Sequence, residues 1–451
     1  MEHFGLFVRS PYYNPNEHLV ELFDHLLTLH PCFAEEQTEE ALVYQSAFPG
    51  QPFDKKRLGY FMSGLLKLGE KFLGVQRTEK QEILFECQAL RELSEREQEK
   101  HYARRYKKVK DTLDARQHRD GDSYYHNYLL ADMELNASNP QKEDFDANLQ
   151  AASNALDGYY FINKLKYSCE MLNRQAIVSE QFSIPFMEEV SNYLSSSQQS
   201  EPLVGIYLQI YYSMLYPDDN QHFKKLLELI AEHATSIGLS ELKNIYLYAI
   251  NICTRKIREG KEQFLAVALN LYEEGIRNKS LFDNHYLSHW TYNNIVKLAL
   301  RLERFEWIEK FIYTYNASFQ ENALHYNLAE LHFHKEDYGQ ALVHLNQVHS
   351  FDVKYHLVAR ILLIKAFYES NAIDACMSAL ASFTVYLSRN KEIAVSLKKS
   401  CQNFCALLHR VMSHSSQKKR EKLRQQIRDR QPLADRAWLM KVFEDQEKKL
   451  K

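Results

Sequence analysis

Three side chains near residue 405 have the types and spacing of a metal site. Cys401, Cys405 and His409 lie four residues apart in an expected helix, which predicts that they share one face. A closed metal site needs a fourth ligand, and His414 lies off that face. Free cysteine is among the most buried residue types. We therefore interpret this group as core packing, with metal binding as the alternative.

Histidines are concentrated in one region of the last third of the chain. No HExxH motif or other spacing of two histidines with a carboxylate occurs among them. We therefore predict no metal and no zinc enzyme here. The six residues are His325, His332, His334, His344, His349 and His356.

Motifs for catalysis and for phosphate or dinucleotide binding are absent from the sequence. It contains no GxSxG, GxxxxGK[ST], GxGxxG or CxxC. Adjacent carboxylates such as Glu188-Glu189 and Glu273-Glu274 are typical of solvated helix faces. The sequence thus predicts no catalytic residue, no cofactor and no enzymatic activity. An enzyme with an unrecognised site is kept as a third alternative.

Two basic runs, Arg104–Lys110 and Lys418–Arg430, have the composition of phosphate-binding helices. In the second run, Leu423 and Ile427 are spaced for one packed side, and acidic residues dilute the charge. We interpret both runs as solvated helix faces. A nucleic-acid-associated regulator is the second functional alternative.

The overall composition favours helices. Of 451 residues, 13 are glycine and 10 are proline, well below the roughly 12% of average usage. A net charge of −3 gives no general attraction to nucleic acid or anionic lipid. The N-terminal residues do not resemble a signal peptide, no apolar stretch is long enough to cross a membrane, and the seven cysteines are scattered. We expect a soluble cytoplasmic protein with no membrane contact.

Hydrophobic residues recur at helical spacing through nearly the whole chain, and we find no convincing strand. The first segments are His18–His30 and Lys55–Leu73, the latter with Asp54 as N-cap. Thr78 and Gln81 have the spacing of a capping box that opens another helix. Two solvated helices are expected from residue 79 to 117. An array of helices of about 11–17 residues with short connections follows, which indicates antiparallel hairpins.

A repeat is visible in the last third. Ile308, Ala341 and Ala375 are 33 and 34 residues apart, each near the start of a second helix. The best copy is Asn327–Leu345, in which Ala329 and Ala341 allow two helix backbones to approach closely. Such hairpins bury their apolar faces only by stacking. The sequence predicts an all-α, right-handed superhelical solenoid of antiparallel helix hairpins.

These residues resemble the tetratricopeptide-repeat family. The whole chain is also similar to a group of bacterial proteins of comparable length, through the segments at 156–170, 289–307 and 432–439. The family resemblance implies that the first helices of the hairpins form a concave face that binds extended peptides. Transferred by register, the peptide-binding positions are Asn293, Lys297, Arg301, Tyr326, Glu330, His334, Arg360 and Tyr368.

We therefore predict a non-catalytic scaffold or adaptor of the bacterial cytoplasm, with another protein or a peptide segment as partner. The expected parts are an N-terminal helical region (1–119), degenerate hairpin repeats (120–286), tetratricopeptide-like repeats (287–410) and a basic C-terminal cap (411–451). In the cap, Trp438, Leu439, Val442 and Phe443 are spaced to cover the last hairpin. The sequence leaves the partner and the oligomeric state open.

Overall fold

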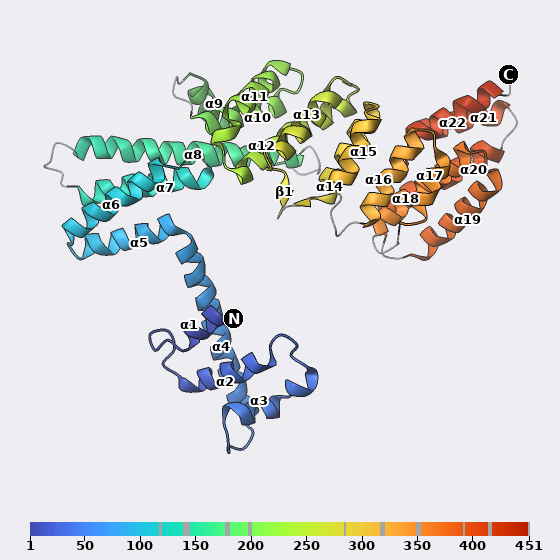
Figure 1. Ribbon diagram of the computed structural model, residues 1–451. Helices are drawn as coiled ribbons and strands as arrows, with labels where there is room; N and C mark the ends of the chain where they lie inside the picture. Colours follow the sequence, from blue (N-terminus) through green and yellow to red (C-terminus); the bar gives the residue numbers. More distant parts are fainter. Residues whose placement is uncertain are drawn as a thin grey trace. The chain divides into compact units, whose positions relative to one another are not determined.

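The computed structural model describes residues 1–116, 120–138, 145–175, 181–196, 201–283, 286–315, 321–348, 353–390, 393–413 and 417–449. These residues are predominantly α-helical, which confirms the all-α prediction (Figure 1). The chain folds as two compact units. Unit 1 comprises Met1–Tyr167 and Phe186–Val204, and unit 2 comprises Ser168–Pro185 and Gly205–Lys451. The four-part division expected from the sequence stays a prediction.

Unit 1 begins with four helices around one apolar core. Leu22, Phe23, Tyr44 and Phe48 are almost completely buried in it. The unit contains α1 (Glu2–Val8), α2 (Glu17–Leu29), η1 (Glu35–Gln37), α3 (Glu40–Ala47), α4 (Lys55–Lys80), α5 (Glu82–Glu95), α6 (Glu99–Asp114), α7 (Gly121–Ala137) and α9 (Met187–Ser196), with α8 (Phe145–Gln175) and α10 (Pro202–Leu215) ending in unit 2.

The helix ends near α4 show one correct and one wrong prediction. The Asp54 carboxylate accepts hydrogen bonds from the backbone N–H groups of Lys56 and Arg57, so it is the N-cap of α4. Thr78, however, does not open a helix. Its Oγ1 donates to the carbonyl of Gly74, 2.9 Å away, inside the last turns of α4. A threonine hydroxyl satisfied by the preceding turn leaves the helix intact, so α4 continues to Lys80.

Unit 2 is a row of antiparallel helix pairs, as predicted (Figure 1). Besides the ends of α8 and α10, it contains α11 (Asn220–His233), η2 (Ala234–Ser236), α12 (Leu239–Arg258), α13 (Phe264–Arg277), β1 (Phe282–Asp283), β2 (Tyr286–Leu287), α14 (His289–Arg301), α15 (Phe305–Thr314), α16 (Glu321–His334), α17 (Tyr338–Leu345), α18 (Val353–Glu369), α19 (Ile373–Arg389), α20 (Val395–Ser413), α21 (Gln417–Asp429) and α22 (Arg436–Lys449). The two-residue strands pair antiparallel between α13 and α14 and were not predicted.

The same backbone turn closes three successive hairpins. Glu303, Glu336 and Asn371 each follow a first helix with φ near +60°. In each turn the next N–H reaches back to a carbonyl five residues earlier, as Asp337 does to His332 at 2.9 Å. This is the hydrogen bond of a Schellman motif, which satisfies a free carbonyl at the helix end. The three residues are 33 and 35 positions apart, so the turn itself carries the repeat.

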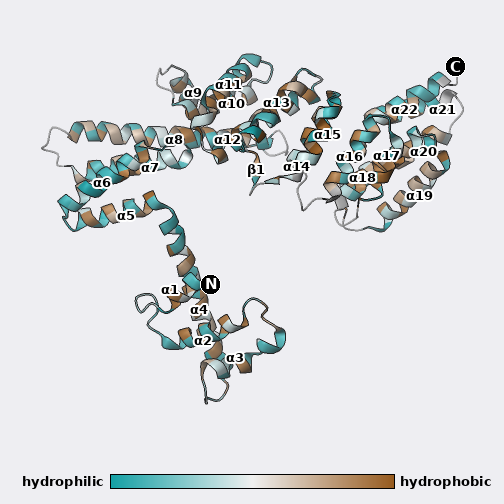
Figure 2. Ribbon diagram, in the orientation of Figure 1, coloured by the Kyte–Doolittle hydropathy of each residue, from teal (hydrophilic) through white to brown (hydrophobic). Residues whose placement is uncertain are grey.

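Stacking of these hairpins forms a continuous apolar core. Ala329 and Ala341 are fully buried between α16 and α17, as predicted from the best repeat copy. At the end of unit 2, Trp438, Leu439, Val442 and Phe443 pack into the core of α18–α20, which confirms the helical cap. Most helices carry both hydrophobic and hydrophilic residues (Figure 2). The described residues contain no helix with the length and apolar content of a membrane span.

The turn at Glu336 generates a stability prediction. A non-glycine residue in the left-handed region costs about 1–2 kcal/mol, whereas glycine adopts it freely at an entropic cost of roughly 0.5–1 kcal/mol. We expect Glu336→Gly to raise the free energy of unfolding by about 0.5–1 kcal/mol, measured by urea denaturation with far-ultraviolet circular dichroism.

The control is Gln340→Gly at an exposed position within α17. There a glycine is destabilising by roughly 0.5–1 kcal/mol. If Glu336→Gly lowers stability as Gln340→Gly does, the turn does not have the conformation described.

Candidate functional site

Five of the eight predicted peptide-binding residues line one cavity of unit 2. The cavity has a volume of about 430 Å³ and is formed by α14, α16, α18 and the residues before α22. We call it the first-helix cavity. It forms here because α14 contacts α16 and α16 contacts α18, which brings together positions one repeat apart. The five residues are Lys297, Arg301, Tyr326, Glu330 and His334.

The α16 side of this cavity is polar and internally hydrogen-bonded. Tyr326, only 4% exposed, donates its hydroxyl to the carboxylate of Glu330, one helical turn further. Burial and the adjacent Glu330 carboxylate raise the pKa of Tyr326 well above its ordinary value. The tyrosine is therefore a hydrogen-bond donor and not a base. Nδ1 of His334 donates to the backbone carbonyl of Glu330 at 2.8 Å.

Three cations of the cavity differ in how their charge is balanced. Nζ of Lys365 lies 2.6 Å from the Asp435 carboxylate, and the lysine side chain is only 11% exposed. Arg301 faces Glu262 at 3.4 Å, with both side chains solvated. Lys297 is exposed and has no side-chain hydrogen bond or ion pair within the described residues. The cavity thus presents one unpaired and one weakly paired positive charge.

The other three predicted binding residues lie outside this cavity. Nδ2 of Asn293 donates to the Tyr355 hydroxyl at 2.7 Å, and its Oδ1 accepts from Asn327 at 2.7 Å, so Asn293 connects α14, α16 and α18. Arg360 lines a separate cavity of about 210 Å³. Tyr368 packs edge-to-face on Trp438, with its hydroxyl accepting from another residue of α22.

Sequence reasoning missed two charged residues of the cavity, Lys365 and Asp435. They are far apart in the sequence, and no motif connects them. It also missed Asn327, although a signal was present. Asn293 and Asn327 are 34 residues apart, which is the repeat period, and polar residues of the same type at this spacing meet on adjacent first helices.

Three of the clustered histidines meet between α16 and α17. Nδ1 of His325 lies 3.2 Å from Nδ1 of His344, and the rings of His332 and His344 are 5.5 Å apart. Nδ1 of His332 also lies 3.4 Å from the Asp337 carboxylate. Among the described residues no group of three potential ligands is placed to hold a metal ion. His349 lies outside the described residues.

The group near residue 405 is part of the core, with one correction. Cys401 and Cys405 are almost completely buried, and burial raises their thiol pKa values to about 11 and about 12. Thiols with such pKa values stay protonated and unreactive at neutral pH. His409 is exposed instead of sharing their face. Eight residues at 100° each rotate the helix about 80° past full turns, which separates His409 from Cys401. His414 lies outside the described residues.

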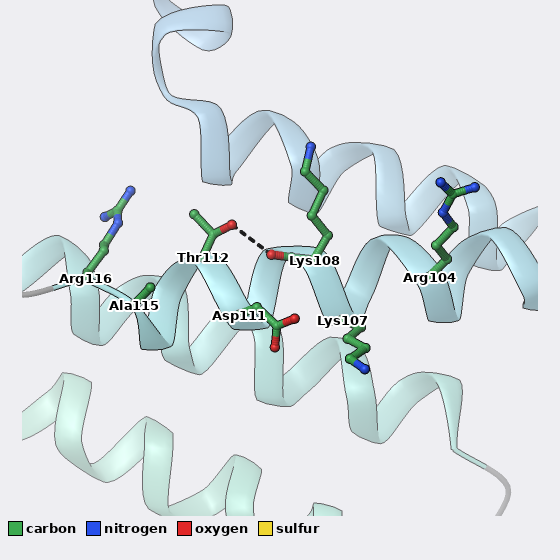
Figure 3. A pocket seen from close by; sticks show the side chains of 7 residues that line it. All are labelled: Arg104, Lys107, Lys108, Asp111, Thr112, Ala115 and Arg116. Atoms are coloured by element: carbon green, nitrogen blue, oxygen red, sulfur yellow. Dashed lines mark hydrogen bonds between the residues drawn. The ribbon is translucent and has the colours of Figure 1, made fainter.

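The first basic run forms α6 in unit 1. Arg104, Lys107 and Lys108 line a surface depression whose walls all come from this helix and its final turn (Figure 3). Arg104 and Lys108 point to one side of the helix and Lys107 to the other. Arg105 is paired with Glu86, and Lys110 lies 3.9 Å from Glu134. The positive side chains therefore do not form one uninterrupted face.

The second basic run forms α21 and is anchored as predicted. Leu423 and Ile427 are buried in the core of the cap. Arg424 lies 3.7 Å from the Glu444 carboxylate, and Arg410 of α20 bonds to Gln426. The face of α21 that carries Leu423 and Ile427 therefore packs in the core of the cap.

Comparisons with known proteins identify no family: no family model and no curated protein matches the sequence. Two solved structures are similar at low identity. A human IFIT1 dimer with PPP-AAAA is 13% identical over 86% of this chain and 94% of that chain, with a TM-score of 0.28. The APC/C hetero-tetramer Cut9-Hcn1 is 12% identical over 98% and 86%, also with a TM-score of 0.28. Because both TM-scores lie below 0.5, nothing those structures bind is transferred to this chain.

The histidine cluster generates a prediction on pH. Burial, and then the charges of His325 and His332, lower the pKa of His344. Near its ordinary pKa of about 6.5, the unfolded chain therefore binds a proton more readily than the folded chain. Acidification through that range should destabilise the fold, and His344→Gln should reduce the loss between about pH 7.5 and pH 5.5, measured by urea denaturation.

Other charges face the cluster: Asp337 beside His332, and Glu309, which is paired with Lys335. The matched control is His3→Gln, an exposed histidine of α1, which should leave the pH profile unchanged. An equal loss of stability in the wild type and His344→Gln would show that the cluster does not couple protonation to folding.

Proposed function

We propose that this chain is a non-catalytic scaffold that binds an extended protein segment in the first-helix cavity, with an acidic side chain beside Lys297 and Arg301. One observation carries the proposal. Five residues selected by repeat register alone line a single cavity, although they come from two different helices. An elongated ligand crosses one first helix after another. Its binding residues must therefore lie at equivalent positions of adjacent repeats.

The chemistry of the cavity supports a peptide. Leu300, Val358 and Leu362 supply apolar wall, while Glu330 and His334 offer polar groups to a backbone. An exposed lysine and arginine attract a carboxylate, and the arginine is capable of bidentate contact. The groups on the cavity wall thus match an apolar and acidic segment.

Catalysis has no support in this cavity. Its described lining residues include no serine, threonine or cysteine as a nucleophile. Tyr326, with its pKa raised by burial, keeps its proton. Phosphate binding on α6 has less support than peptide binding, because Arg105 and Lys110 already face carboxylates.

The test is a selection of random displayed peptides on the full-length chain, followed by affinity measurement by fluorescence anisotropy. We expect the selected peptides to be enriched in Asp and Glu next to apolar residues. The double variant Lys297→Glu, Arg301→Glu should weaken binding by at least about ten-fold, because it replaces attraction of the carboxylate by repulsion.

The matched control is Arg277→Glu, Lys310→Glu. It makes the same charge change at exposed positions on the second helices α13 and α15. If both double variants weaken peptide binding equally, the peptide is attracted by the general charge of the protein and not by the first-helix cavity. Selection of no peptide would also contradict the proposal. Retention only of nucleic acid, with a steep loss of affinity as salt rises, would favour the basic helices instead.

A further inference from the structure

A second cavity in unit 2 lies at the C-terminal ends of three helices. It has a volume of about 550 Å³ and is lined by the last turns of α8 and α10, the last two turns of α12 and the residue Pro217. We call it the α12 cavity. This volume is in the usual range of cavities for small molecules. Its described lining shares no residue with the first-helix cavity, and it contains no Asp or Glu.

Lys256, one of the lining residues, is a buried cation without a counter-charge in contact. It is 2% exposed, and its Nζ donates to the Pro217 carbonyl at 2.7 Å and to Asn220 Oδ1 at 2.6 Å. Both acceptors are neutral. Nζ also lies 5.0 Å from the centre of the Phe264 ring. Within the described residues, no carboxylate lies within 4.0 Å of this ammonium group.

Burial of a charge without an opposite charge is costly. An ammonium group taken out of water loses hydration free energy, which neutral hydrogen-bond acceptors replace only in part. Desolvation, followed by repulsion from Lys261, lowers the pKa of Lys256, and attraction by Glu259 and Asp218 offsets this only in part. An anion in the adjacent cavity would add to that attraction. Since Pro217 both accepts from Lys256 and lines the cavity, the ammonium group is close to its wall.

Two arginines add positive charge to the same cavity. Arg255 lies 3.5 Å from Glu259, and both side chains are substantially exposed. Arg258 is exposed, and in the described chain it has neither an ion pair nor a side-chain hydrogen bond. Two carboxylates outside the lining, Glu259 and Asp218, also attract Lys256. The three cations of the lining outnumber them, so the cavity has a net positive charge.

The remaining walls define the rest of a ligand. Asn251 donates to the side-chain oxygen of Asn173 at 3.3 Å, and both amides line the cavity with further hydrogen-bonding capacity. Leu172, Met214 and Ile252 supply apolar surface. A ligand that fits has an anionic group at one end and an apolar body at the other.

We propose that the α12 cavity binds a small amphipathic organic anion, with its carboxylate or phosphate beside Lys256 and Arg258 and its apolar body against Leu172, Met214 and Ile252. This site is independent of peptide binding in the first-helix cavity. It gives the scaffold a second ligand of a different chemical class.

A structural explanation competes with this proposal. Basic residues in the last turn of a helix interact favourably with the helix dipole, and Arg255, Lys256 and Arg258 are in the last turn of α12. The dipole accounts for a basic helix end in any surroundings. It does not account for a cavity without lining carboxylates beside a lysine whose hydrogen-bond acceptors are both neutral. The anion-binding proposal predicts that an anion binds in this cavity, whereas the helix-dipole explanation does not.

The experiment uses the full-length chain and the fluorescent organic anion 8-anilinonaphthalene-1-sulfonate as reporter. Octyl phosphate and octanoate, each below its micelle concentration, compete with the reporter, and 1-octanol is the uncharged control. We expect saturable reporter binding and displacement by at least one of the two anions but not by 1-octanol. The relative potency of the two anions distinguishes phosphate from carboxylate recognition.

Two variants locate the site. Arg258→Glu should weaken reporter binding by at least about ten-fold, because an exposed cation becomes an anion at the cavity. Lys224→Glu, the same charge change at an exposed position of α11, should leave it unchanged.

Three results would overturn the proposal. They are the absence of saturable binding, displacement by 1-octanol as effective as displacement by the anions, and equal weakening by Arg258→Glu and Lys224→Glu. Because Arg258 is exposed, its variant tests the site without disturbing the buried Lys256.

Discussion

The left-handed turn that closes three successive hairpins determines how the first helices of those hairpins stack in unit 2. Glu303, Glu336 and Asn371 end their first helices in the same conformation, and each turn forms the same backbone hydrogen bond. Identical reversals at almost constant spacing keep the first helices next to one another. This geometry places residues about 34 positions apart in contact, as the hydrogen bond between Asn293 and Asn327 shows. The first-helix cavity is a consequence of this repeat.

Charge is balanced in two contrasting ways along unit 2. Lys365 is nearly buried but pairs with Asp435, so its charge is neutralised inside the chain and holds the segment before α22 against α18. Removal of one partner from such a pair leaves an unsatisfied buried charge. Lys256 is buried more deeply, and both of its hydrogen-bond acceptors are neutral. The first lysine thus stabilises the cap, and the second is available to a ligand.

Helical periodicity explains why much of this fold was predictable. A residue's position on a helix follows from 100° per residue, and residues four apart lie on one face. Lys297 and Arg301 have this spacing, as do Tyr326 and Glu330, and all four line one cavity. Burial of Ala329 and Ala341 followed from the repeat for the same reason. These inferences need only the spacing of residues within a helix and the repeat period.

One wrong prediction and two unpredicted contacts depend on information that local spacing does not contain. Thr78 has the sequence pattern of a cap, but its hydroxyl bonds to the preceding turn and α4 continues. The contact of Tyr368 with Trp438 depends on where a helix about 70 residues later packs. The pairing of Lys365 with Asp435 has the same origin. Contacts between distant segments are determined by tertiary packing, and one sequence carries no periodic signal for them.

Site-specific photo-crosslinking tests the central claim most directly. A photoreactive phenylalanine analogue would replace Val358 in the first-helix cavity or, as the matched control, Val343 on the second helix α17; the two valines are 37% and 48% exposed. Each full-length variant would be irradiated with the same selected peptide, and the products analysed by mass spectrometry. Our account predicts a crosslink from position 358 and none from position 343. Crosslinking from 343 alone, or equally from both positions, would contradict binding in the first-helix cavity.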